Sequence, residues 1–259
     1  MEDGTILDLL PLRPEIGAEI RGLDLSAPQT PERVQAIRHA LVEYGLLIFR
    51  DQTMSEEQHI AFAGEFGIPE VHPTREGADG RPEIFVIDTA DGAPTAEWWH
   101  TDMTALTAPP MGSILHMQIT PESGGDTEWA SQTAAYAALP PAVKQRLEGL
   151  RALHRAWWDA ETQNSHPVVR VHPESGRKGL FVNGIFTQRI LDIPEDESEE
   201  LLAFLLAHAV EERFTVRHAW QPGDVAFWDN RSTQHRVHND FGDARRRIHR
   251  VTVTGEIPV

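Results

Sequence analysis

The sequence predicts an all-β barrel or jelly roll with helices packed on its outside. A series of short apolar stretches, separated by Gly and Pro turns, occupies the second half of the chain. At least three further segments carry helical signals. No internal repeat or low-complexity linker interrupts the 259 residues, so one domain over residues 1–259 is expected. The strand-like stretches are Val168–Val171, Phe181–Val182, Phe214–Val216, Asp224–Trp228 and His249–Val253.

The first helix is expected to begin after Thr30. The Thr30 hydroxyl can cap free backbone N–H groups, and Pro31 stands where its missing N–H costs nothing. Apolar residues follow at helical spacing, and Gly45 ends the helix. The continuous apolar run Leu46–Phe49 then predicts a buried strand.

A second helix is expected to begin at Ser55. Ser55 and Gln58 have the spacing of a capping box, in which each side chain bonds to the backbone of the other residue. This helix is expected to end near Gly67. Two strands are predicted after it, at Ile84–Ile87 and at Ser113–Ile119, the second of them half-buried.

Later helical signals occur at Thr133–Leu139, Pro141–Leu150 and Glu195–Val210. The last segment has acidic residues in its first turn, where they interact favourably with the helix dipole. Its leucines share one face, so this face is expected to pack against the rest of the protein.

The composition excludes several classes of protein. Lys plus Arg number 23 and Asp plus Glu number 40, and the net charge of −17 disfavours binding to nucleic-acid phosphates. Cysteine is absent, which excludes disulfides, thiolate nucleophiles and cysteine-ligated metals. The acidic N-terminus lacks the pattern of a secretory signal, and no apolar run approaches the roughly 18 residues of a membrane span. We therefore expect a cytoplasmic protein that binds neither nucleic acid nor membrane.

Among 13 histidines, two combine with an aspartate into a candidate metal site. His100 and Asp102 are two residues apart, so on a strand both side chains point to one face. His235 follows another strand and turn far downstream. Two imidazoles and one carboxylate leave three coordination positions open and suit oxygen-activating Fe(II), whereas structural zinc sites are closed and usually contain Cys. The alternative is a hydrogen-bonded His100–Asp102 pair inside the barrel.

Arg245–Arg250 is a basic run in an acidic chain. Such a run is commonly a solvated edge strand that its charges protect. Strand alternation, however, directs Arg246, Ile248 and Arg250 to one face. If that face lines the barrel, two guanidinium groups lie near the metal and require an anionic co-substrate, an anionic substrate or both.

Together these residues resemble the Fe(II)/2-oxoglutarate-dependent dioxygenases of the taurine dioxygenase type, which include alkylsulfatases and chlorophenoxyalkanoate dioxygenases. The shared motifs run through nearly the whole chain and are highly specific in combination. The resemblance implies a mainly β fold, the double-stranded β-helix (jelly roll), with flanking helices. The motifs are Gly45–Gln52, Trp99–Asp102, Gly124–Thr127, His166–Arg170, Gln221–Asp224, Trp228–Arg231, Gln234–His235 and Arg246–Arg250.

The resemblance implies that His100, Asp102 and His235 are the iron ligands. It implies that Arg246, eleven residues after His235, and the hydroxyl of Thr127 bind the far carboxylate of 2-oxoglutarate. In this family, dioxygen decarboxylates 2-oxoglutarate to succinate and CO2, and a substrate C–H bond is hydroxylated. If the hydroxylated carbon bears sulfonate, sulfate or aryloxy, the product collapses to an aldehyde or ketone and releases sulfite, sulfate or phenol.

The same resemblance assigns four residues to the substrate. Arg250, four residues after Arg246, matches the position that holds the substrate anion. His72 matches a histidine that faces the substrate, and Phe186 matches an aromatic residue that packs on taurine. Met103, next to the ligand Asp, is expected to line the same pocket. The alternative for His72 is an exposed loop residue.

Three features depart from the taurine pattern. Ala96 stands where the taurine enzyme has Asn, and Arg75 stands where it has Tyr, so taurine itself is not the expected substrate. The segment from Trp157 to Ser165, a lid in relatives, is short and is expected to leave the pocket more open. Trp157 and Trp158 could stack on an aromatic substrate, although a place in the core is favoured.

The preferred substrate is therefore a small organic anion such as an alkylsulfonate or alkyl sulfate, with an aryloxyalkanoate or another carboxylate as the alternative. A hydrolase would use the same His, Asp and His with zinc, and a binding protein would keep only the scaffold. The intact Asp102 argues against a halogenase, in which a small residue replaces the carboxylate ligand. Relatives form homo-oligomers, so a dimer or tetramer is expected.

Overall fold

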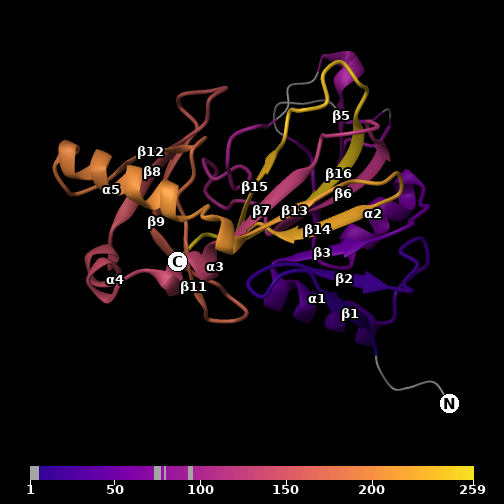
Figure 1. Ribbon diagram of the computed structural model, residues 1–259, viewed down its shortest axis with the longest axis horizontal. Coiled ribbons are helices and arrows are strands. Elements are labelled where there is room, and N and C mark those ends of the chain that lie inside the picture. The colour runs from indigo at the N-terminus through magenta and orange to yellow at the C-terminus, as the bar shows by residue number, and fades with distance from the viewer. Residues whose placement is uncertain (1–5, 73–76, 79, 93–95) are drawn as a thin grey trace.

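The computed structural model describes residues 6–72, 77–78, 80–92 and 96–259. Strands predominate and helices lie outside them, as the sequence predicts (Figure 1). Among these residues no helix is long and apolar enough to cross a membrane. The helices are α1 (Pro31–Tyr44), α2 (Glu56–Gly64), α3 (Gln132–Ala138), α4 (Pro141–Leu147) and α5 (Glu195–His208), with single turns η1 (Thr89–Asp91) and η2 (Glu212–Phe214). The strands are β1 (Asp8–Pro11), β2 (Ala18–Arg21), β3 (Leu46–Phe49), β4 (Pro69–Glu70), β5 (Ile84–Asp88), β6 (Gly112–Ile119), β7 (Thr127–Ser131), β8 (Arg151–Arg155), β9 (Gln163–Pro167), β10 (Val169–Val171), β11 (Lys178–Leu180), β12 (Thr187–Ile190), β13 (Thr215–His218), β14 (Val225–Asp229), β15 (Thr233–Val237) and β16 (Arg247–Val253).

Two sheets pack face to face and form the jelly roll. The larger sheet has the strand order β1-β2-β3-β14-β6-β16-β4, and β5 also pairs with β16. The smaller sheet has the order β13-β7-β15. One buried apolar cluster joins Ile48, Met117 and Trp228 of the larger sheet to Trp129 and Val216 of the smaller sheet. The predicted fold class, a double-stranded β-helix with flanking helices, is confirmed.

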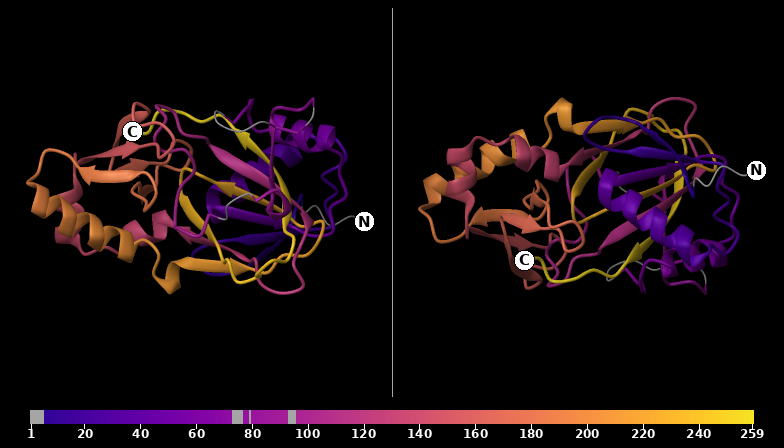
Figure 2. Two further views of the ribbon diagram at one scale, coloured as in Figure 1. Left: turned by 90° about the horizontal axis from the view of Figure 1, so that it is seen from above. Right: turned by 90° about the horizontal axis from the view of Figure 1, so that it is seen from below.

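Helices α1 and α2 cover the outer face of the larger sheet (Figures 1 and 2). Successive side chains of a strand point to opposite faces, so Leu47 and Phe49 pack in the cluster that includes both helices, while Leu46 and Ile48 face the barrel. Strand β3 is therefore buried on both faces, which explains its continuous apolar sequence.

The helix ends follow the expected capping chemistry. Thr30 caps α1 through its side chain, and Gly45 ends α1 with a left-handed φ of +70°. Ser55 and Gln58 form the predicted capping box of α2. This helix ends at Gly64, three residues before the predicted end.

A second group of elements lies beside the barrel and is drawn at the left of Figure 1. It contains α3, α4, α5, the sheet β12-β8-β9 and the pair β10-β11. Leu201, Leu202 and Leu205 of α5 pack on Ile190 of β12 and on Phe214, in an apolar cluster of their own. The predicted apolar face of this helix is thus confirmed.

Two predicted elements differ from the structure. The strand predicted at Phe181–Val182 is wrong: β11 ends at Leu180, although Phe181 N still donates to the Val168 carbonyl at 2.8 Å. The helix predicted to reach Leu150 ends at Leu147, since Gly149 adopts a φ of +75°, outside the helical region.

The burial of two strands also differs from expectation. Most of β6 is fully buried rather than half-buried, because Ile114 faces the helix-covered side and Leu115 faces the barrel. The edge-strand interpretation of Arg245–Arg250 is wrong. Strand β16 lies inside the larger sheet, between β6 on one side and β4 and β5 on the other.

Buried histidines outside the barrel interior are expected to make stability depend on pH. Burial, together with the neighbouring His116 and His166, lowers the pKa of His59 and of His154 to about 3. In the unfolded chain the ordinary pKa of 6.5 applies, so the unfolded state binds more protons. Stability is complete above about pH 6.5 and falls as the pH drops toward 3, by about 2 kcal/mol per histidine at pH 5.

We therefore expect His59→Asn to reduce the loss of stability between about pH 7.5 and about pH 5 by about 2 kcal/mol, whatever its own cost at high pH. Urea unfolding at the two pH values measures this difference. The exposed His39 supplies the control variant His39→Asn. Equal losses in wild type and His59→Asn would contradict the assignment.

Candidate metal centre

Three buried side chains that the sequence singles out converge inside the barrel. One ligand atom from each of His100, Asp102 and His235 lies within 4.8 Å of the others, and the described residues contain no second group of this kind. Asp102 Oδ1 is 3.7 Å from His100 Nε2 and 4.0 Å from His235 Nε2. Metal–ligand distances of about 2 Å separate neighbouring donor atoms by about 3 Å, so small adjustments would close the set around one ion.

The backbone joins the two histidines directly. His235 lies on β15, and His100 forms an isolated bridge with it through N–H···O bonds of 3.0 and 2.8 Å. The strand expected through His100 and Asp102 is wrong, because Asp102 lies in the turn after the bridge. Turn geometry, with Met103 at a left-handed φ of +55°, therefore directs the carboxylate toward the imidazoles.

The protonation of the three groups suits a metal. His100 Nδ1 donates to the Trp98 carbonyl at 2.8 Å, since a carbonyl only accepts, and Nε2 keeps its lone pair. Burial lowers the pKa of His100 and of His235, which favours neutral imidazoles. Burial raises the pKa of Asp102, but nearby positive charge, above all that of Arg250, outweighs it and holds that pKa below its usual range. Two neutral imidazoles and one carboxylate are the donor set that fits Fe(II).

The predicted 2-oxoglutarate residues, Thr127 at the start of β7 and Arg246 just before β16, lie together. Arg246 is buried, and its Nε donates to the Gly125 carbonyl at 3.1 Å while Nη2 donates to Thr127 Oγ1 at 3.4 Å. Burial lowers the pKa of Arg246 to about 10, against the opposing effect of Asp126. No carboxylate of the described residues forms an ion pair with Arg246. A buried cation with only neutral partners suits an incoming carboxylate.

Trp220 adds a residue to this group that the sequence analysis missed. Its Nε1 donates to Thr127 Oγ1 at 2.9 Å, so the Thr127 oxygen accepts from both Trp220 and Arg246. The hydroxyl hydrogen is then left to donate to an anion. Gly125 is required beside them: its φ is +72°, and a Cβ there would lie 3.3 Å from Arg246 Cδ.

Three of the four predicted substrate residues, His72, Met103 and Arg250, line one pocket together with Asp102. Arg250 Nη1 lies 3.1 and 3.2 Å from the two carboxylate oxygens of Asp102. His72 is half-buried and stacks on Phe85 with ring centroids 4.7 Å apart, so it is not an exposed loop residue. Four further residues line this pocket and were not predicted from the sequence: Glu70, Glu83, Phe85 and Thr252.

The fourth residue, Phe186, does not line this pocket. It packs with Ala105 and Ala156 and meets Trp158 edge-on at 6.0 Å. The core position favoured for both tryptophans is wrong for Trp157, whose side chain is 69% exposed.

Of the two substituted positions that depart from the taurine pattern, Ala96 lies near the first ligand. Ala96 is half-buried, and its carbonyl accepts a hydrogen bond from Val237 N. Arg75 lies outside the described residues.

Asn230 is a further residue that the sequence analysis did not assign, although it quoted the Trp228–Arg231 motif. The Asn230 side chain accepts a hydrogen bond from Asp102 N at 2.8 Å. The motif indicates that Asn230 belongs to the family pattern, but the sequence alone does not reveal which backbone groups its amide will bind.

Comparisons with known proteins agree with this geometry. Residues 8–252 match the model of the family "Taurine catabolism dioxygenase TauD, TfdA family". The chain is 40% identical to an alkylsulfatase of Acinetobacter baylyi, over 97% of this chain and 86% of that enzyme. It is 39% identical to an alpha-ketoglutarate-dependent sulfate ester dioxygenase of Pseudomonas putida, over 98% of this chain and 91% of that enzyme.

Solved structures lead to the same conclusion. A taurine dioxygenase from Burkholderia xenovorans superposes with a TM-score of 0.92 at 40% identity, covering 98% of this chain and 91% of that chain. Fold, metal-binding side chains and sequence thus agree over nearly the whole length. The chain belongs to the taurine catabolism dioxygenase TauD, TfdA family.

Proposed function

We propose that this chain, an Fe(II)- and 2-oxoglutarate-dependent dioxygenase, hydroxylates the carbon next to the anionic group of an alkyl sulfate or alkylsulfonate. The observation that carries the proposal is the position of Arg250, which shares a pocket with Asp102 and contacts it directly. An anion bound to Arg250 would hold its neighbouring C–H bonds beside the metal-binding side chains.

The proposed roles follow from the two buried polar regions. His100, Asp102 and His235 would hold Fe(II), while Arg246 and the Thr127 hydroxyl would bind the far carboxylate of 2-oxoglutarate. Iron held there supplies the oxidising chemistry that couples dioxygen and 2-oxoglutarate to C–H hydroxylation. The surrounding residues exclude water, and His72, Met103 and Arg250 would orient the substrate. Phe186, which packs beside Trp158 outside this pocket, would also contact the substrate.

The anionic group determines the fate of the product. A hydroxylated carbon that carries a sulfate ester is a hemiacetal-like centre, and its collapse gives an aldehyde and inorganic sulfate. With a sulfonate, the released ion is sulfite. The relatives named alkylsulfatase and sulfate ester dioxygenase support the sulfate ester as the first choice. Aryloxyalkanoates and other carboxylates are the second choice, since a 2,4-dichlorophenoxyacetate dioxygenase of Cupriavidus pinatubonensis is 33% identical.

We further propose that residues 1–259 form one catalytic domain of a cytoplasmic homo-oligomer, a dimer or tetramer, that does not bind nucleic acid. The net charge of −17 supports the last point. Sedimentation velocity measures the oligomeric state.

Sulfate release tests the reaction. We expect the protein with Fe(II), 2-oxoglutarate and a medium-chain alkyl sulfate to form sulfate and succinate in equal amounts, and only in the presence of dioxygen. Sulfate formed without dioxygen or 2-oxoglutarate would instead support the hydrolase. Phenol release from aryloxyacetates, with no turnover of sulfates or sulfonates, would select the second choice of substrate.

His235→Ala is expected to abolish Mn(II) binding in calorimetry and succinate formation with Fe(II), because one imidazole ligand is lost. His238→Ala is the matched control: His238, three residues after His235, is half-buried and pairs with Glu128 rather than with the metal site. Full turnover by His235→Ala would contradict the assigned ligand set.

Substitution of each of the two buried arginines is expected to weaken the binding of a different reactant. Arg246→Ala should raise the KM for 2-oxoglutarate about 10- to 100-fold, the effect of about 1.5–3 kcal/mol from charged hydrogen bonds. Arg250→Ala should raise the KM for the organic anion by a similar factor. Steady-state kinetics with each reactant varied in turn measures both effects. The reverse pattern would mean that the two arginines have exchanged roles.

A further inference from the structure

One buried asparagine, Asn230, binds both the backbone N–H and the backbone carbonyl of the candidate ligand Asp102. Asp102 N donates to Asn230 Oδ1 at 2.8 Å, and Asn230 Nδ2 donates to the Asp102 carbonyl at 3.1 Å. The second hydrogen of Nδ2 reaches the Pro110 carbonyl at 3.0 Å. Asn230 is 1% exposed, so no water competes for these bonds. The three partners also determine which amide atom is oxygen, since only Oδ1 can accept from Asp102 N.

Asp102 needs such support because no strand holds it. The bridge of His100 with His235 ends two residues earlier, and Asp102 lies in a turn followed by the left-handed Met103. Thr101 Oγ1 donates to the Thr233 carbonyl at 3.0 Å, which fixes the residue before Asp102. On the carboxylate itself, the protein contacts are Arg250 and a 3.3 Å hydrogen bond from Ser113 Oγ.

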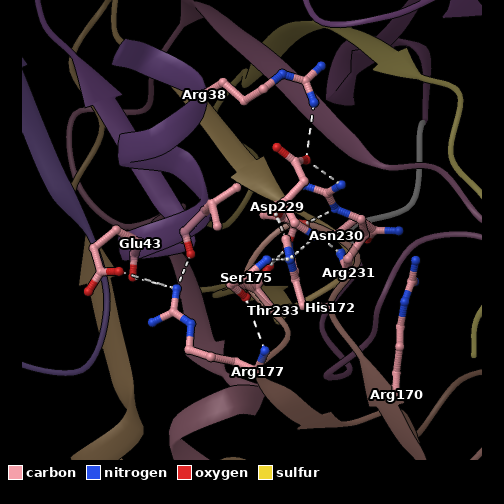
Figure 3. A network of polar contacts seen from close by, with 12 residues as sticks. Arg38, Glu43, Arg170, His172, Ser175, Arg177, Asp229, Asn230, Arg231 and Thr233 are labelled. Atoms are coloured by element: carbon pink, nitrogen blue, oxygen red, sulfur yellow. Dashed lines mark hydrogen bonds and ion pairs between the residues drawn. The ribbon is translucent and has the colours of Figure 1, made fainter. Parts of the chain in front are cut away.

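A buried ionic network involves the residues on both sides of Asn230 in the sequence (Figure 3). Its neighbours in sequence pair with each other: Arg231 Nε and Nη2 donate to the two carboxylate oxygens of Asp229 at 2.9 and 2.7 Å. His172 Nε2 lies 3.0 Å from Asp229 Oδ2. Burial raises the pKa of Asp229, but Arg231 and His172 outweigh it and hold the pKa below its usual range, so the carboxylate stays charged.

The network reaches two other parts of the fold. Arg231 Nη1 donates to Glu174 Oε1 at 2.8 Å, and Arg38 of α1 donates to the same oxygen at 3.1 Å. Figure 3 shows Arg38 approaching from above and His172 lying beside Asp229. The turn that carries Asn230 is thereby tied to the outer helix layer and to the segment between β10 and β11. None of these charges touches the metal-binding side chains.

We propose that Asn230 is a positioning residue that sets the carboxylate of Asp102 for metal binding, and that the Asp229–Arg231 network orients Asn230 for this task. The proposal rests on the proposed function in one respect, the assignment of Asp102 as a ligand. Groups that orient ligands from outside the coordination sphere typically change metal affinity about 10- to 100-fold when they are removed.

The test is the Kd for Mn(II), measured by calorimetry at a temperature where every variant is folded. Asn230→Ala should raise the Kd about 10- to 100-fold. Gln52→Ala is the matched control, since the Gln52 amide also bridges backbone groups, at Leu23, Leu25 and Arg50, away from the metal site. This control should lower the unfolding temperature and leave the Kd within about twofold of wild type.

Asn230→Asp serves if Asn230→Ala does not fold. It keeps the shape of the side chain and the acceptor for Asp102 N but loses both donors, so it should also weaken Mn(II) binding. A folded Asn230 variant with wild-type Mn(II) affinity would overturn the proposal. If His235→Ala also binds Mn(II) normally, the metal assignment itself has failed; if only His235→Ala loses binding, the positioning role alone has failed.

Discussion

The two backbone hydrogen bonds between His100 and His235 are the constraint on which the rest of the site depends. They attach an irregular segment to β15, the end strand of the smaller sheet. In that sheet β15 pairs with β7, so the ladder that carries His235 opposite Trp129 also carries Val237 opposite Thr127. One set of backbone bonds therefore fixes the spacing between the metal-binding imidazoles and the hydroxyl proposed for 2-oxoglutarate. Packing of Trp228 against the His235 ring, at 4.8 Å, adds support from the larger sheet.

The larger sheet provides two buried positive charges, Arg246 and Arg250. Arg246 directly precedes β16 and Arg250 lies within it, and both are buried in spite of the cost of burying a cation. Arg250 is compensated by Asp102, whereas Arg246 has neutral partners only among the described residues. This difference matches their proposed roles: a co-substrate carboxylate supplies the missing charge at Arg246, and a substrate anion competes with Asp102 for Arg250.

The sequence predicted the parts of the fold that local chemistry controls. Capping groups and apolar runs, such as Ser55 with Gln58 or Leu46–Phe49, define elements without help from distant residues. Strands β7 and β15 were not predicted, because polar residues such as Thr127 and Gln234 interrupt their apolar pattern. The candidate metal ligands were predicted from motifs, and the structure brings them together, although the strand geometry assumed for Asp102 was wrong. Trp220, Glu70 and Asn230 were missed since their contacts depend on tertiary packing.

Anaerobic visible spectroscopy tests the central claim most directly, because the metal-to-ligand charge-transfer band requires Fe(II) and 2-oxoglutarate to be bound together. We expect a weak visible band when Fe(II) and 2-oxoglutarate are added to the protein. An alkyl sulfate or alkylsulfonate should shift this band as the anion binds beside the metal. A folded protein that shows no band under these conditions would contradict the assignment of the buried His100, Asp102 and His235 as an iron centre.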